Sequence, residues 1–116
     1  MNGNTQLFKG TLTTIILKLL DEEGRMYGYE ITKKVKEQSK GSLTLTEGAL
    51  YPALHKLETD KLVEVSIEMV GNRPRKYYTL TRTGQTEAQV KLAELARFIT
   101  DIQMLFNLQP SIIKPS

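Results

Sequence analysis

Apolar side chains recur in steps of three and four along the first half of the chain, the spacing of one face of a helix. In residues 7–20 this face consists of Phe8, Leu12, Ile15, Ile16, Leu19 and Leu20. The pattern predicts a helix there, ending before Gly24. A spacing of four relates Tyr27, Ile31 and Val35, which predicts a second helix over residues 27–39.

A third helix is predicted over residues 46–60. Its apolar face comprises Leu50, Leu54 and Leu57. Two N-terminal caps fit the sequence, either Thr46 alone or Thr44 with Glu47 as a capping box. Pro52 removes one backbone hydrogen bond within this helix, so we expect a kink or an irregular first turn.

The period of the pattern then changes from helical to two residues. Apolar and polar positions alternate through Val63, Glu64, Val65, Ser66, Ile67, Glu68 and Met69. This alternation predicts a half-buried strand. Residues 76–80 include the strand-forming Tyr77, Tyr78 and Thr79 and predict a returning strand. The segment Gly71-Asn72-Arg73-Pro74 is the expected hairpin turn.

A last, long helix is predicted over residues 82–107, with Thr81 as its cap. Its apolar stripe advances by an average of 3.5 residues through Ala88, Leu92, Leu95, Ile99, Ile102 and Phe106. That average is the seam period of a coiled coil. A helix of about 26 residues extends roughly 39 Å, farther than so small a head covers. We therefore expect a dimer with an interface made of Leu92, Leu95, Ile99, Ile102 and Phe106.

Composition excludes several classes of function. The chain has 116 residues, no cysteine and a single histidine, His55, so thiolate chemistry and multi-histidine metal sites within one chain are excluded. There is no glycine-rich phosphate loop and no motif of paired carboxylates, so we expect no catalytic residues, metal or cofactor. Neither a membrane span nor a signal peptide is apparent, which predicts a cytoplasmic protein.

The distribution of charge is more informative than the mild net charge of +3. Between Met69 and Thr86 the chain contains no acidic residue. The basic residues in this segment are Arg73, Arg75, Lys76 and Arg82. A helix followed by a basic-tipped hairpin is typical of a winged helix-turn-helix, which mostly binds duplex DNA. The predicted fold is therefore mainly α (α+β), a winged helix-turn-helix with a two-stranded wing and a long C-terminal dimerisation helix.

This fold divides the chain into a DNA-binding domain over residues 1–81, a dimerisation helix over 82–108 and a tail over 109–116. Pro110 and Pro115 lie in the tail, which we expect to be disordered. The second helix carries further cations, at Lys33, Lys34, Lys36 and Lys40. We expect a solvated face in which Lys33 and Lys34 pair with Glu30 or Glu37. Contact of one of these lysines with phosphate is the alternative.

Four ordered motifs run through residues 7–106. They are Tyr27-Gly28-Tyr29-Glu30-Ile31, Gly48-Ala49-Leu50-Tyr51-Pro52-Ala53-Leu54 with Leu57-Glu58, Arg75-Lys76-Tyr77-Tyr78, and Leu80-Thr81 with Gly84. On these motifs the chain resembles the PadR family of bacterial transcriptional regulators, in particular its short members with a single C-terminal helix. Two departures stand out. Asp60-Lys61 replaces the family's common acidic-glycine turn, and the chain contains no tryptophan.

The resemblance implies a homodimeric repressor that binds an inverted-repeat operator in double-stranded DNA and is relieved by an unknown small-molecule effector. The third helix would enter the major groove, the wing would follow the backbone or minor groove, and the C-terminal helices would be exchanged between subunits. The implied DNA-binding residues are Thr46, Gly48, Ala49, Tyr51, His55, Lys56, Arg73, Arg75 and Lys76.

Leu95 stands where some short members of the family hold a tryptophan that sandwiches planar drugs. Aromatic sandwiching is therefore not expected, and Leu95 and Phe98 are candidates for lining a smaller pocket. The rival interpretation is a winged-helix module that binds protein and not specific DNA, because a net charge of +3 is low for a DNA-binding protein.

Overall fold

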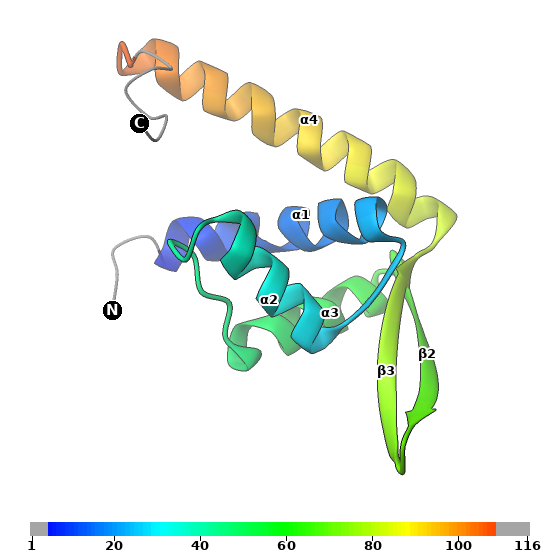
Figure 1. The fold of residues 1–116 in the computed structure, drawn as a ribbon. Helices are drawn as coiled ribbons and strands as arrows, with labels where there is room; N and C mark the ends of the chain where they lie inside the picture. The colour runs from blue at the N-terminus through cyan, green and yellow to red at the C-terminus, as the bar shows by residue number, and fades with distance from the viewer. Residues whose placement is uncertain (1–4, 109–116) are drawn as a thin grey trace.

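The computed structural model describes residues 5–108 as four helices and a three-stranded antiparallel sheet (Figure 1). In chain order the elements are α1 (Thr5–Glu23), β1 (Arg25–Tyr27), α2 (Gly28–Gln38), α3 (Glu47–Thr59), β2 (Val63–Val70), β3 (Arg73–Leu80) and α4 (Arg82–Leu105). The predicted winged-helix architecture is confirmed. The expected disordered tail, residues 109–116, lies outside the described residues.

Helix α1 forms the centre of the core, because it contacts α3, α4, β1 and β3. The buried side chains of α1 are Leu12, Ile16, Leu17, Leu19 and Leu20. Phe8 and Ile15, which the helical pattern assigns to the apolar face, are only partly buried. Leu17 lies off that face and is buried nonetheless, because the surrounding elements enclose the helix on more than one side.

Strand β1 was not predicted, and it changes the role of Tyr27. The sheet has the order β1-β3-β2, with Arg25 opposite Thr79, Met26 opposite Tyr78 and Tyr27 opposite Tyr77. Helix α2 starts only at Gly28, so Tyr27 precedes the helix and is not part of its apolar face. The buried positions of α2 are Gly28, Ile31 and Val35.

The wing is longer and its turn tighter than the sequence predicts. Val70 pairs with Arg73, which leaves the two-residue loop Gly71-Asn72. Gly71 has a φ of +63°, as the first position of such a loop requires in a type II′ turn. Arg73 and Pro74 therefore belong to β3 and not to the turn.

The predicted half-burial of the first wing strand holds only near its start. Val63 is buried and Val65 partly buried. Ile67 and Met69 are 61% and 65% exposed. The period of two correctly predicts the strand. The apolar side of its distal half has no core to cover, because the wing extends beyond the helices (Figure 1).

Helix α3 begins at the cap expected from one of the two alternatives. The Thr46 side chain accepts a hydrogen bond of 3.3 Å from the Ala49 amide. The helix continues past Pro52 as one element from Glu47 to Thr59, so Pro52 does not end it. The face that contains Leu50, Leu54 and Leu57 is buried, as predicted.

Helix α4 is fastened to the segment between α3 and β2. The Thr81 hydroxyl caps the helix by accepting from the Gly84 amide at 2.9 Å and donates to the Lys61 carbonyl at 2.8 Å. A Cβ atom at Gly84 would lie 1.9 Å from the Leu62 carbonyl oxygen, so only glycine fits there. Ala88, which the 3.5-residue stripe includes, is buried in the chain's own core.

No helix within residues 5–108 combines the length and the apolar character needed to cross a membrane.

Candidate nucleic-acid interface

The side of α3 opposite its buried leucines forms an accessible stripe. Gly48, Tyr51 and His55 are exposed there, and their spacing places them on one side of the helix. A Cβ atom at Gly48 would meet nothing closer than the Thr46 hydroxyl at 3.9 Å. Space beside this residue is therefore open to a ligand that approaches the backbone.

The remaining α3 residues of the predicted site border this stripe. Thr46 and Lys56 are exposed, and Ala49 is partly buried. The Lys56 ammonium lies 3.2 Å from the Asp60 carboxylate. Such an exposed pair, four residues apart on a helix, is weak, so the lysine remains available to a stronger anion.

Tyr51 is held in place although its side chain is 45% exposed. A Cβ atom at Gly28 would lie 2.4 Å from the Tyr51 hydroxyl and 3.0 Å from its Cζ. The phenol thus packs on the bare backbone at the start of α2. On the core side lies Tyr78, whose pKa is raised by burial and then by the charge of Tyr51. The absence of a side chain at Gly28 therefore leaves room for the Tyr51 ring, a role of Gly28 that the sequence did not reveal.

The basic residues of the wing lie on two different faces. Alternation along a strand places Arg73 and Arg75 on one face with Tyr77, and Lys76 on the other. The register sets Glu68 directly opposite Arg75 and Ile67 opposite Lys76. Although the segment between Met69 and Thr86 contains no acidic residue, Arg75 does have an acidic neighbour, because Glu68 of β2 lies opposite it.

Arg75 is also occupied by aromatic contacts. Its guanidinium lies 4.0 Å from the centre of the Tyr27 ring and donates to the Tyr77 hydroxyl at 3.5 Å. That hydrogen bond raises the pKa of Arg75. Arg73 and Lys76 are exposed, and no described residue forms an ion pair with either. These two cations are the accessible ones on the wing.

Arg25 forms a second set of contacts on the same face of the sheet. It forms a hydrogen-bonded ion pair with Glu68, and the hydrogen bond raises the pKa of Arg25. Its guanidinium lies 3.9 Å from the centre of the Tyr77 ring. Sequence patterns gave no sign of Arg25, because β1 has only three residues, too few for a periodic pattern.

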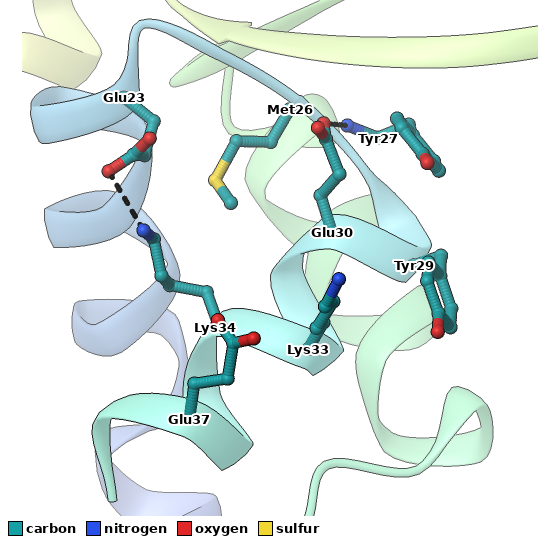
Figure 2. A pocket seen from close by; sticks show the side chains of 8 residues that line it. All are labelled: Glu23, Met26, Tyr27, Tyr29, Glu30, Lys33, Lys34 and Glu37. Carbon is teal, nitrogen blue, oxygen red and sulfur yellow. Dashed lines mark hydrogen bonds and ion pairs between the residues drawn. The ribbon is translucent and has the colours of Figure 1, made fainter.

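Helix α2 borders a small hollow at the end of α1 (Figure 2). Its volume is about 230 Å³, and its lining includes Glu23, Glu30, Lys33 and Lys34. Lys34 pairs with Glu23 of α1 at 3.4 Å, and Glu30 accepts from the Tyr27 amide at 3.1 Å. The predicted pairing of these lysines with Glu30 or Glu37 is therefore wrong.

The other lysines of α2 lie closer to α3. Lys33 and Lys36 line a hollow of about 450 Å³ together with Thr44, which precedes the first turn of α3. Within residues 5–108 no carboxylate forms an ion pair with Lys33, Lys36 or Lys40. Glu37 lines the same hollow, so the start of α3 is flanked on the α2 side by Lys33, Lys36 and one carboxylate.

Helix α4 extends beyond the core (Figure 1), and several of its apolar side chains are exposed. Of the five predicted interface residues, Ile99 and Phe106 are 47% and 63% exposed. The other three, Leu92, Leu95 and Ile102, are partly buried. Leu95 and Phe98 line a groove of about 440 Å³ between α4 and the first half of α1. The two candidate ligand residues are therefore brought together.

Comparison with known proteins identifies the family of this chain. The model of the transcriptional regulator PadR-like family matches residues 16–90. An uncharacterized protein of Lysinibacillus sphaericus is 30% identical over 105 residues, which cover 90% of this chain and 92% of that protein.

Two solved structures with the same fold are also similar to this chain in sequence. A transcriptional regulator from Clostridium thermocellum has a TM-score of 0.78 and 29% identity, covering 86% of this chain and 94% of that chain. Bacillus subtilis PadR, solved in complex with operator DNA, has a TM-score of 0.64 and 32% identity over 70% of this chain and 46% of that chain.

Proposed function

The chain belongs to the PadR-like family of transcriptional regulators, and we propose that it is a homodimeric repressor that binds a specific sequence of double-stranded DNA. The accessible stripe of α3, with Gly48 open to close approach and Tyr51 seated on Gly28, carries this proposal. The operator complex of Bacillus subtilis PadR supports it.

Helix α3 reads the major groove in this proposal. A helix fits that groove, and side chains near its N-terminus reach the base edges. Tyr51, His55 and Lys56 supply donors and acceptors along the stripe, while Thr46, Gly48 and Ala49 allow the helix to approach closely. Arg73 and Lys76 of the wing neutralise phosphates on one side of α3.

Lys33 and Lys36 of α2 provide phosphate contacts on the opposite flank of α3. They are free of ion pairs with described residues and line the hollow next to Thr44. In a helix-turn-helix the first helix crosses the DNA backbone, so lysines of α2 would lie near phosphates. Their role here reverses the expectation of a merely solvated face.

The uncovered part of α4 supports the proposed dimer. Exposed apolar side chains that continue along one helix are unusual for a monomer and mark a contact surface. A partner α4 and its α1 cover Leu92, Leu95, Ile99, Ile102 and Phe106. Two-fold symmetry then sets two α3 helices about one DNA turn apart, roughly 34–36 Å, which matches an inverted repeat.

An effector site is proposed in the groove between α1 and α4. Leu95 and Phe98 give it an apolar wall, and Gln6 and Thr14 add polar groups. A compact apolar ligand that binds there more tightly in one dimer geometry shifts the population toward that geometry. If the favoured geometry has the wrong spacing of α3 helices, the operator is released.

The test is a selection from a random-sequence duplex library, followed by fluorescence anisotropy at two salt concentrations. We expect enrichment of an inverted repeat, bound roughly 10³-fold more tightly than a scrambled duplex. Equal and salt-sensitive binding to both duplexes would reject sequence specificity. A dimer that binds neither duplex at low salt would leave the protein-binding module as the function.

A further inference from the structure

The wing loses one of its neighbours part of the way along its length. Strand β1 pairs with β3 only through Thr79, Tyr78 and Tyr77. Beyond Tyr77 the wing is a ribbon of two strands, β2 and β3. Two-stranded ribbons twist strongly and are marginally stable alone. Backbone pairing therefore leaves the direction of the distal wing weakly determined.

Side chains cross this point in both directions. Arg25 of β1 extends over the Tyr77 ring of β3, at 3.9 Å, to the Glu68 carboxylate of β2. Arg75 of β3 extends the other way and lies 4.0 Å from the Tyr27 ring of β1. Tyr27 and Tyr77 themselves meet edge to face, with ring centres 5.5 Å apart. These five residues, which we call the wing clasp, link all three strands.

The clasp also connects the wing to the recognition helix. The Tyr27 amide donates to Glu30 of α2 at 3.1 Å, a bond that Figure 2 shows at the start of that helix. The next residue, Gly28, seats Tyr51 of α3. Contacts therefore run from the distal wing through β1 and α2 to the side chain proposed to read DNA.

We propose that the wing clasp fixes the angle between the wing and α3, and that its residues position the DNA-binding surface without contacting DNA themselves. This inference rests on the proposed function and corrects one expectation drawn from the sequence resemblance. Arg75, which the sequence resemblance places on phosphate, is a positioning residue. Arg25 and Glu68, which no sequence motif marks, share that role.

Glu68 offers a test in which two explanations predict opposite signs. If charge alone matters, removal of a carboxylate from a DNA-binding wing strengthens binding at low salt. If Glu68 holds Arg25 in the clasp, its removal weakens binding to the selected duplex. Glu64 is a matched control, because it lies on the same strand and face, is exposed and has no ion pair among the described residues.

The experiment measures anisotropy of Glu68→Ala and Glu64→Ala with the duplex selected by the unmodified protein and with its scrambled version. We expect Glu68→Ala to bind the selected duplex roughly fivefold more weakly, the loss of an ion pair and a cation–π contact. Its binding to the scrambled duplex stays the same or tightens. Glu64→Ala should bind both duplexes as tightly as the unmodified protein or more so.

A second pair of variants removes stacking without changing charge. Tyr27→Leu deletes the aromatic surface beneath Arg75, and Tyr27→Phe keeps it. We expect Tyr27→Leu to lose preference for the selected duplex at an unchanged salt slope, while Tyr27→Phe retains it.

Glu68→Ala binding as tightly as Glu64→Ala, or Tyr27→Leu matching Tyr27→Phe, would overturn the clasp. Both results leave the proposed function intact. That function fails separately, if the unmodified protein itself shows no preference between the duplexes.

Discussion

Two parts of the molecule project from its core, the wing and α4, and both start from the same short segment. Leu62 immediately precedes β2, and its carbonyl accepts from the Thr81 amide at 3.0 Å at the base of α4. Lys61 accepts from the Thr81 hydroxyl. The two projections leave this base in different directions (Figure 1).

The projections differ in what supports them beyond the base. The wing is held by charged and aromatic contacts within the chain, from Arg25 to Glu68 and from Arg75 to Tyr27. Helix α4 packs on α1, but its buried residues are Gly84 and Ala88 near its start, and its last turns expose Met104, Leu105 and Phe106. The wing thus has its charged contacts within one chain, whereas the exposed apolar side chains of α4 are those that the proposed dimer would cover.

A charge on the α4 stripe should disrupt the proposed dimer most strongly. Ile99→Glu places a carboxylate at the centre of the proposed interface, twice in each dimer because of the two-fold symmetry. Burial of an unpaired charge costs several kcal/mol, so the dimer dissociation constant should rise by about 10³-fold or more. Analytical ultracentrifugation measures this change. Thr100→Glu, exposed and off the stripe, should remain dimeric, and a dimeric Ile99→Glu would disprove the interface.

The next largest effect concerns the base of α4. Gly84→Ala forces a Cβ atom to 1.9 Å from the Leu62 carbonyl oxygen, which requires a backbone shift. Overpacking against backbone should lower the free energy of unfolding by about 3 kcal/mol, measured by urea denaturation. Gln85→Ala, the exposed neighbour, should change it by less than about 0.5 kcal/mol. Equal stability of the two variants would mean that α4 is not fastened at Gly84.

The wing is tested through its accessible cations. Arg73→Ala with Lys76→Ala removes two proposed phosphate contacts, so the slope of log affinity against log salt should become shallower by about 1.8, or 0.9 for each contact. Affinity should fall for selected and scrambled duplexes alike. Lys9→Ala with Lys18→Ala removes the same charge from α1 and should leave the slope unchanged. If both double variants lower the slope equally, the cations act through net charge alone.

Whether an element of the fold could be predicted from the sequence depended on the length of its hydrophobic pattern. Long periodic segments such as the α3 leucines and the alternation from Val63 predicted elements correctly. Strand β1 was missed because three residues carry no period, and Tyr27 was consequently assigned to a helix face. Burial of Ile67 and Met69 was overestimated because alternation reveals a strand but not how far the core extends.

Exposure of Tyr51 was predictable from the sequence, but the contacts within the candidate site were not, and its role in DNA binding stays a prediction. The resemblance placed Tyr51 and the wing cations in one surface, and the α3 stripe agrees with exposure of Tyr51 and His55. Arg75 contacts Tyr27, and Glu68 lies opposite Arg75. Both contacts depend on strand register, which motif spacing alone does not set. Contacts between distant segments were the part that sequence patterns could not supply.

The base shared by the wing and α4 contains one unfavourable backbone conformation. Lys61 has a φ of +62°, the left-handed region that glycine adopts most readily. The Lys61 amide donates to the Glu58 carbonyl at 3.0 Å, and the Leu62 amide donates to the Leu57 carbonyl at 2.9 Å. These two hydrogen bonds form a Schellman motif at the end of α3. The departure Asp60-Lys61 thus keeps the turn of an acidic-glycine pair, with lysine in the glycine position.

The smallest predicted effect is a gain at this position. Lys61→Gly relieves a left-handed conformation that costs roughly 1–2 kcal/mol for a residue with a side chain, offset by about 0.5–1 kcal/mol of extra freedom in the unfolded chain. The free energy of unfolding should therefore rise by up to about 1.5 kcal/mol in urea denaturation. Glu58→Gly, inside the helix, should lower it by about 1 kcal/mol. A loss of stability in Lys61→Gly would show that the lysine stem stabilises this junction by more than its backbone conformation costs, and that the base common to wing and α4 depends on a side chain as well as on hydrogen bonds.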